Sequence, residues 1–356
     1  MTEGKALRRN GAAARPARLA SRFGVCYHRI LQRVRGFPVR SPRVRFGLCV
    51  AACAAALGTG AASARSLYAV PKYAAFLVDA DNGEVLYARQ ADAPRFPASI
   101  TKVLTLYLAF DAITKGQLRP DDLITVSARA ASQAPSKLGL RAGETISVRD
   151  AIGVIATKSA NDIAVALAEH IGGSEEAYAA KMTATARRLG MRNSTFVNAT
   201  GLPDKRQLTT ARDIATLSRA LLRDFPQFYG VFSRVAYDYE GEAIGNHNHL
   251  LTTLPGVDGI KTGFTNAAGF TLAASAAHDG VRLVAVVLGG PSRMARDNNV
   301  TDLLDTGFEV LTRRSRGETT TVAANLAEID DLSDTVMEHL SEQGSGDALA
   351  LGGAPR

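Results

Sequence analysis

The alternation of apolar and polar positions predicts β-strands in two separate parts of the chain. Short apolar runs at residues 75–79 and 85–88 flank Asn82-Gly83, and such a dipeptide between two strand-like runs predicts a hairpin. Three more β-prone runs follow much later, at residues 256–262, 270–276 and 281–288. The expected strands therefore lie at both ends of one folded region.

Helical periodicity fills the region between these strands. The first expected helix is the strongly apolar run that follows Pro97. A longer helical stretch begins at Ser147, which can cap it, and breaks near Ser159. The remaining helical segments are residues 175–189, a segment that starts after Thr210, and residues 293–311. Strands at both ends with helices between them predict an α+β fold, in which the early hairpin and the late strands form one antiparallel sheet covered by helices.

The basic residues are concentrated at the start of the chain, so the net charge does not describe the rest of the protein. The chain has 42 Lys and Arg and 34 Asp and Glu, for a formal net charge of +8. Residues 1–64 hold 12 of the basic residues and one acid, Glu3, so the remainder, with 30 basic and 33 acidic residues, carries −3. The excess of positive charge belongs to the leader, and we therefore expect no nucleic-acid partner.

The leader has the pattern of a secretory signal peptide. Arginines precede an apolar run at residues 46–60, which ends in the cleavage-site pattern Ala62-Ser63-Ala64. The apolar run is short for a membrane span, so an uncleaved anchor is the weaker alternative. A start assigned too far upstream would account for the long basic region ahead of it. We expect an exported, periplasmic protein that is soluble or loosely associated with the membrane.

Two further observations complete the expected domain organisation. The leader holds all three cysteines, Cys26, Cys49 and Cys53, so the mature protein is expected to have neither disulfides nor a thiol nucleophile. Residues 65–315 are expected to form the catalytic domain. Residues 316–356 are acidic and poor in aromatic residues, and we expect a disordered tail there and no second β-rich domain.

The first candidate motif is Ser99-Ile100-Thr101-Lys102, immediately before the first apolar helix. Residues three apart on a helix share a face, so Ser99 and Lys102 are expected to lie together. A serine hydroxyl needs a base to become a nucleophile. A lysine can be that base when burial, positive neighbours and a helix N-terminus lower its pKa. The spacing alone is weak, because a capping serine and a surface lysine give the same pattern.

Two further motifs strengthen the first. Ser159-Ala160-Asn161 lies at the expected helix break, and Lys261-Thr262-Gly263 is expected at the end of a late strand. Each alone also fits a helix cap or a strand that turns at a glycine. The three motifs in this order are the pattern of penicillin-binding proteins and serine β-lactamases.

Acyl transfer gives each of these residues a role. Ser99 would be the nucleophile, Lys102 its base and Ser159 the proton path to the leaving amine. Asn161 would hold Lys102 and a substrate amide, and Lys261 would keep Lys102 deprotonated. The backbone N–H groups of Ser99 and Phe264 would stabilise the oxyanion, while Gly263 would let a substrate peptide approach the strand edge.

Residues 75–311 resemble the serine D-alanyl-D-alanine carboxypeptidases, the low-molecular-mass penicillin-binding proteins. The resemblance rests on the three motifs and on the sequence around them, at residues 77–86, 159–168 and 256–265. It implies a β-lactamase/transpeptidase-like fold and removal of the terminal D-alanine from peptidoglycan stem pentapeptides through an acyl-serine, with β-lactams as inhibitors. It also implies that Arg296, by its position near the closing helix, binds the substrate's terminal carboxylate together with Thr262.

Some features depart from this family or fall outside it. Many relatives continue into a β-rich domain and a basic amphipathic helix that lies on the membrane. The tail after Arg316 is too short and too acidic for either, so no C-terminal membrane anchor is expected. We expect no cofactor and no metal, because the pair in His247-Asn248-His249 has no cysteine or acid cluster near it in the sequence.

Three alternative functions are compatible with parts of the pattern. A class A β-lactamase would carry a Glu-x-x-Leu-Asn stretch between Asn161 and Lys261, and the sequence has none there. A non-catalytic sensor of muropeptides or β-lactams would be expected to lose Ser99, Lys102 or Lys261, and all three are present. A DD-endopeptidase that cuts cross-linked peptidoglycan keeps the same motifs, and this alternative stays open.

Overall fold

A computed structural model describes residues 72–326 of the chain. The strands are β1 (Ala74–Asp79), β2 (Val85–Arg89), β3 (Leu123–Thr125), β4 (Thr145–Ser147), β5 (Ala236–Tyr239), β6 (Glu242–Gly245), β7 (Val257–Thr265), β8 (Gly269–His278) and β9 (Val281–Gly290). The helices are η1 (Ala98–Ile100, a 3-10 turn), α2 (Thr101–Thr114), α3 (Ala128–Ala131), α4 (Val148–Ala156), α5 (Asn161–Gly172), α6 (Glu175–Leu189), α7 (Ala211–Asp224), α8 (Pro226–Tyr229), α9 (Leu250–Thr253), α10 (Arg293–Ser315) and α11 (Val322–Asn325). The expected signal peptide lies outside the described residues.

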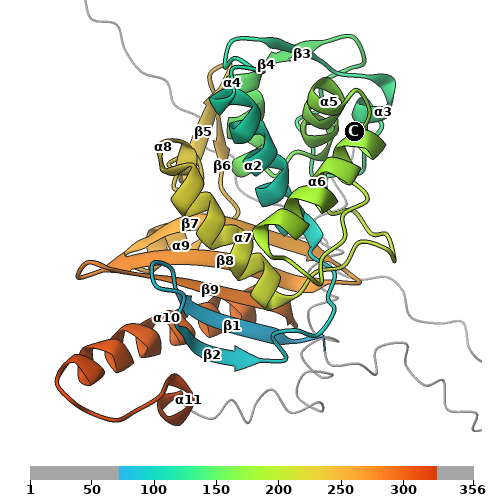
Figure 1. The fold of residues 1–356 in the computed structure, drawn as a ribbon. Coiled ribbons are helices and arrows are strands. Elements are labelled where there is room, and N and C mark those ends of the chain that lie inside the picture. Colours follow the sequence, from blue (N-terminus) through green and yellow to red (C-terminus); the bar gives the residue numbers. More distant parts are fainter. Residues whose placement is uncertain (1–71, 327–356) are drawn as a thin grey trace, which may run out of the picture. The chain divides into compact units, whose positions relative to one another are not determined.

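A five-stranded antiparallel sheet in the order β2-β1-β9-β8-β7 forms the centre of the fold (Figure 1). The early hairpin joins the late strands through β1 and β9, where Leu77 lies opposite Ala285. Within the described residues β7 is hydrogen-bonded to β8 alone and is therefore one edge of the sheet. The predicted α+β fold, with one sheet built from both ends of the domain, is confirmed.

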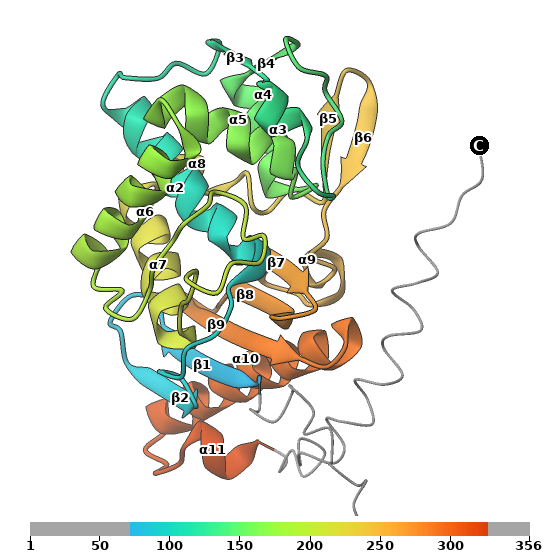
Figure 2. The ribbon, with the colours of Figure 1, turned by 90° about the vertical axis from the view of Figure 1, so that its right-hand side faces the viewer.

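Helices cover both faces of this sheet (Figures 1 and 2). Successive residues of a strand point to opposite faces. Phe76 of β1 accordingly joins the core that contains α2 and α7, whereas Leu77 joins the core that contains α10. The helices α7 and α10 thus close the two faces, and the alternation of apolar residues along the strands accounts for both cores.

The helical block between the strands is centred on α2. Nearly every residue of α2 is buried, as expected for a helix that is apolar on all sides. Ser147 caps α4 as predicted, since its hydroxyl accepts a hydrogen bond from the Asp150 N–H at 3.0 Å. The helical stretch that begins there ends at Ala156 and resumes at Asn161, which confirms the predicted break.

The end of the first late strand and two small hairpins differ from the sequence-based expectation. β7 was expected to end at Thr262 but continues to Thr265, so Lys261 lies inside the strand and not at its end. The hairpins β3–β4 and β5–β6 lie in segments read as loops or left unassigned. Their strands have three and four residues each, which is too short for a clear alternation of apolar and polar positions.

Residues 316–326 contradict the prediction of disorder from Arg316 onward. α11 begins after Thr321, whose hydroxyl accepts a hydrogen bond from the Ala324 N–H at 3.2 Å. Val322 is completely buried in the core beneath α10. Composition alone missed this segment because a few contacts hold it on an existing core: Val322, the partly buried Leu326, and the hydrogen bond that Arg313 donates to Asn325 at 2.6 Å. Among residues 72–326, no helix has both the length and the apolar content needed to cross a membrane.

Candidate active site

The structure brings the first two motifs into direct contact. The Lys102 Nζ donates a hydrogen bond to the Asn161 Oδ1 at 2.6 Å and lies 3.2 Å from the Ser99 Oγ. Ser99 belongs to η1, Lys102 to the first turn of α2 and Asn161 to the first turn of α5. The predicted contact between Ser99 and Lys102 is therefore present, although Ser99 does not cap α2.

Two glycines allow the chain to crowd around the Ser99 backbone. A Cβ atom on Gly201 would lie 1.8 Å from the Ala98 carbonyl oxygen, and one on Gly263 would lie 2.7 Å from the Ser99 nitrogen. Gly263 was expected to make room for a substrate. Its missing side chain also makes room for the nucleophile's own backbone and brings β7 against η1, while the room for a substrate stays a prediction.

Burial favours the neutral form of Lys102, the form that can act as a base. Its side chain has no exposed surface, and removal from water is the main reason that the pKa of Lys102 lies well below its usual range. The positive charge of Lys261 lowers this pKa further, while the Asp162 carboxylate opposes the shift. The predicted direction of the effect of Lys261 on Lys102 agrees with the structure.

The partners of Lys102 orient its lone pair. Its Nζ also donates to the Thr200 carbonyl oxygen at 2.6 Å. A neutral amine has two N–H bonds and one lone pair, and carbonyl oxygens can only accept. If the Asn161 and Thr200 oxygens take both hydrogens, the lone pair is left for the Ser99 hydroxyl. This arrangement can remove a proton from Ser99.

Ser159 lies at the helix break with an uncommitted hydroxyl. Its backbone is in the left-handed region, with φ of 63°, and its side chain is 4% exposed. The Ser159 Oγ has no hydrogen-bond partner among the described residues. A buried hydroxyl without a partner is unfavourable for folding alone, so its retention is typical of a functional site. The hydroxyl is therefore not committed to any other group of the described structure.

The segment 134–139 holds Asn161 in place. The Asn161 backbone N–H donates to the Ser136 carbonyl at 2.7 Å, and its Nδ2 donates to the Ala134 carbonyl at 2.8 Å. One hydrogen of the side-chain amide is thus used, and the second is left for the carbonyl of a bound peptide. Sequence reasoning placed Asn161 in the site but did not identify this supporting segment.

Lys261 and Arg296 are two buried basic residues, and the charge of Arg296 acts on Lys261. The Lys261 Nζ donates to the Thr262 carbonyl at 3.2 Å, and burial followed by the positive charge of Arg296 lowers the pKa of Lys261 to about 7. Arg296 lies in the first turn of α10. Its Nη1 donates to the Thr271 carbonyl at 3.0 Å. The Arg296 Nε also lies 2.8 Å from the Asp297 Oδ1. The two groups form an ion pair, but their relative orientation does not meet the geometry of a hydrogen bond.

The edge of β7 supplies the remaining predicted residues. Thr262 is buried, whereas Phe264 is 43% exposed and its ring lies 4.3 Å from the ring of Phe270. Because β7 has a free edge in the described structure, an extended peptide can add to it as a further strand. No group of three or more His, Cys, Asp or Glu within residues 72–326 is placed to hold a metal ion.

The sequence analysis did not identify the Thr200 carbonyl as part of the site. The Thr200 carbonyl contacts Lys102 as closely as Asn161 does, but a backbone carbonyl has no residue-type signature. The available signal was the cluster of turn residues around it. The Asn198 Oδ1 accepts hydrogen bonds from the backbone N–H groups of Thr200 and Gly201, at 3.2 and 2.8 Å, and thereby shapes this turn.

Comparison with known proteins places this geometry in a family. Residues 61–292 match the family model of the D-alanyl-D-alanine carboxypeptidases. The chain is 37% identical over 238 residues to the D-alanyl-D-alanine carboxypeptidase DacF of Bacillus subtilis, covering 66% of this chain and 61% of that protein. It is 36% identical over 239 residues to DacC of Escherichia coli, covering 65% of this chain and 60% of that protein. The match thus spans about three fifths of these relatives.

Solved structures lead to the same assignment. Penicillin binding protein 5 from Haemophilus influenzae matches with a TM-score of 0.64 and 33% identity, covering 66% of this chain and 70% of that one. Penicillin-Binding Protein D2 from Listeria monocytogenes, in its cefotaxime-bound form, matches with a TM-score of 0.61 and 30% identity, covering 66% of this chain and 96% of that one. The predicted resemblance is confirmed, and the chain belongs to the D-alanyl-D-alanine carboxypeptidase family of serine peptidases.

Proposed function

We propose that this protein is a serine DD-carboxypeptidase that removes the terminal D-alanine from peptidoglycan pentapeptides, and that β-lactams acylate the same serine. The observation that carries the proposal is the position of Lys102, a fully buried amine 3.2 Å from the Ser99 hydroxyl with carbonyl oxygens at its other contacts. The family and the cefotaxime-bound relative support the substrate class and the inhibitor class.

The reaction follows from the groups around Ser99. Lys102 takes the hydroxyl proton as the Ser99 Oγ attacks the carbonyl carbon between the last two D-alanines. The backbone N–H groups of Ser99 and Phe264 stabilise the oxyanion. Ser159, whose hydroxyl lacks a partner in the described residues, passes the proton to the leaving amine. D-alanine departs, and water then releases the shortened peptide from the acyl-serine.

The two cations are assigned different parts of the substrate. Arg296 presents a planar fork that suits a carboxylate, so it binds the free acid of the terminal D-alanine together with Thr262. Lys261 lies where its charge reaches Lys102, and it acts on proton transfer as well as on binding. The secretory pattern of residues 1–64 supports action outside the cytoplasm, in the periplasm, where peptidoglycan is found.

Product analysis tests the proposed function. The protein without residues 1–64 is expected to release D-alanine from a pentapeptide and to leave a cross-linked peptide dimer uncut, because Arg296 selects a free terminal carboxylate. Both products are measured by chromatography. Faster cleavage of the dimer than of the pentapeptide would show that the protein is an endopeptidase and not a carboxypeptidase. Turnover of penicillin without either peptide reaction would indicate a β-lactamase.

Substitution of Arg296 is expected to separate binding from catalysis. Loss of one charge-assisted contact with a carboxylate costs about 2 kcal/mol, or about thirtyfold in kcat/KM. Arg296→Ala should lower kcat/KM by this factor for peptides with a free terminal acid and leave it unchanged for an ester substrate that lacks the carboxylate. Lys261→Ala should lower kcat/KM for both substrates. Steady-state kinetics on the matched pair measure the difference. An equal loss on both substrates in Arg296→Ala would mean that Arg296 only braces β8 through the Thr271 carbonyl.

A further inference from the structure

The segment 198–202 forms a wall of the site through its backbone. The Thr200 carbonyl accepts a hydrogen bond from the Lys102 Nζ at 2.6 Å, and Gly201 lies against the Ala98 carbonyl. The direction of the Lys102 lone pair therefore depends on where this segment holds one carbonyl oxygen. Whatever fixes the backbone of residues 198–202 also fixes the base.

A buried carboxylate from α6 reaches this segment. Glu175 is the first residue of α6 and is 3% exposed. Its Oε1 accepts a hydrogen bond from the Ala199 N–H at 3.1 Å. On its other side, the Ala199 carbonyl accepts from the Thr105 hydroxyl of α2 at 2.8 Å. The residue that precedes Thr200 is thus held at both of its backbone polar groups.

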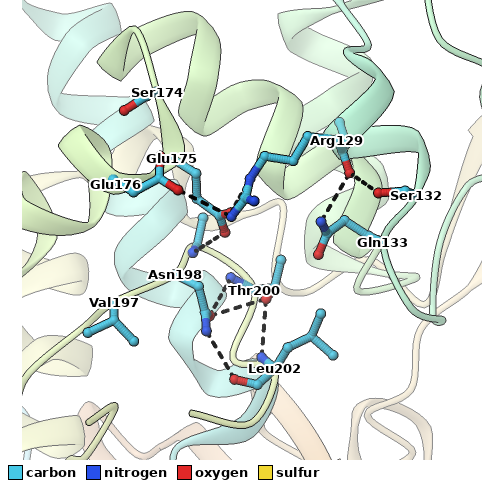
Figure 3. Close-up of polar contacts among 12 residues, drawn as sticks. Arg129, Ser132, Gln133, Ser174, Glu175, Glu176, Val197, Asn198, Thr200 and Leu202 are labelled. Atoms are coloured by element: carbon cyan, nitrogen blue, oxygen red, sulfur yellow. Dashed lines mark hydrogen bonds and ion pairs between the residues drawn. The ribbon is translucent and has the colours of Figure 1, made fainter.

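Arg129 holds the second oxygen of the same carboxylate. The Glu175 Oε2 accepts hydrogen bonds from the Arg129 Nε at 3.1 Å and from its Nη2 at 2.5 Å (Figure 3). The guanidinium also lies 3.4 Å from Glu176. With one oxygen on Ala199 and the other on Arg129, Glu175 has little freedom to turn, and each oxygen of the buried carboxylate has a hydrogen-bond partner.

The ion pair joins the two walls of the site. Arg129 belongs to α3, which is followed by the segment 134–139 that holds Asn161. Glu175 holds the opposite segment, 198–202. Lys102 donates hydrogen bonds to the Asn161 Oδ1 and to the Thr200 carbonyl. The segment after α3 supports the first of these oxygens, and the segment 198–202 carries the second. The Arg129–Glu175 pair connects α3 to the segment 198–202.

We infer that Glu175 is a positioning residue for Lys102: through the Ala199 N–H it holds the Thr200 carbonyl where it orients the base, and Arg129 fixes Glu175. The inference rests on the proposed function, since it assigns Glu175 to the same proton transfer. Glu175 touches neither Ser99 nor Lys102 by any hydrogen bond in the described structure, so its effect passes entirely through the backbone.

The rate of acylation of Ser99 by a fluorescent penicillin measures this role. Glu175→Ala removes the acceptor and is expected to lower the second-order rate constant about tenfold, which corresponds to about 1.4 kcal/mol. Glu175→Gln keeps an oxygen for the Ala199 N–H and is expected to remain within about threefold of the wild type. Rescue by glutamine separates the acceptor from the charge. An equal loss in both variants would overturn the role assigned to the Oε1.

The pH profile of acylation supplies a signature that a merely structural role lacks. A carbonyl that accepts from Lys102 favours its protonated form, so displacement of the Thr200 carbonyl lowers the pKa of Lys102. The charged groups that face Lys102, Lys261 of β7 and Asp162 of α5, are unchanged in the variant. The acid limb of the profile should therefore move to lower pH in Glu175→Ala while the plateau falls. An unmoved limb with an unchanged plateau would overturn the inference.

Two further variants keep the test decisive. Arg129→Ala leaves Glu175 in place and is expected to slow acylation about threefold; if Glu175→Ala does not fold, an unchanged rate in Arg129→Ala contradicts the inference. Arg212→Ala removes an arginine with two hydrogen bonds to the exposed carboxylate of Asp92, at 2.7 and 2.9 Å, and should leave the rate unchanged. A similar loss in Arg212→Ala would show general weakening instead. Absence of acylation in the wild type would refute the proposed function, not the role of Glu175.

Discussion

Fluorescent penicillin is expected to label Ser99 and no other serine. Ser99 is partly exposed, at the N-terminus of α2, and its hydroxyl is 3.2 Å from the buried amine of Lys102. Peptide mapping after labelling identifies the acylated residue. In Ser99→Ala the acylation rate should fall on the order of 10⁴-fold or more, the scale seen when a catalytic nucleophile is removed, so that only reversible binding remains.

Two other serines make this prediction specific. Ser159, unlike Ser99, has a buried hydroxyl without a partner in the described residues, and a label on Ser159 would reverse the roles of the two serines. Ser218 is a buried serine of α7 whose hydroxyl donates to the Ile214 carbonyl at 2.9 Å. Ser218→Ala serves as the control and should be labelled at the wild-type rate, because its hydroxyl takes no part in the site.

Replacement of Lys102 is expected to have the second largest effect. Lys102→Met keeps the length of the side chain but removes the base, and general base catalysis contributes up to about 10⁴-fold. We expect acylation to slow on the order of 10³-fold. The decrease should be in the acylation step and not in the initial binding of penicillin, which stopped-flow measurements over a range of penicillin concentrations separate. A loss confined to binding would contradict the role of Lys102 as the base.

The pH dependence of acylation gives an independent check on Lys102. The base acts when it is neutral, and burial together with Lys261 lowers its pKa well below the usual lysine range. The wild-type rate should therefore rise with pH at a lower pH than it would with an ordinary lysine as the base. Lys261→Met removes a positive neighbour and should move the rising limb to higher pH. Movement to lower pH would contradict the assigned coupling.

The elements that the sequence predicted are those with strong local signals. Asn82-Gly83 between apolar runs identified the first hairpin, and Ser147 identified the start of α4. The first two motifs identified three residues that are in contact in the structure, Ser99, Lys102 and Asn161, because each carries a chemically distinctive side chain. Their order along the chain was sufficient without any knowledge of the distances between them.

The features that were missed depend on contacts distant in sequence or on the backbone. The strand β7 was ended too early because a glycine commonly interrupts a strand, whereas Gly263 continues it and makes close contact with Ser99. The Thr200 carbonyl carries no signature in its residue type. The role of Glu175 depends on partners that lie 24 and 46 residues away in the sequence, which no local pattern relates.

The close contacts of Gly201 and Gly263 limit how this protein can evolve. Any side chain at either position would meet the backbone of Ala98 or Ser99 within 2.7 Å and would displace the nucleophile. Selection for a changed response to antibiotics therefore has no accessible route through these two sites. Substitutions are easier to accommodate where an exposed side chain lies beside the site without holding its backbone in place, as at Phe264. We expect natural differences in ligand preference to arise from substitutions at such exposed positions.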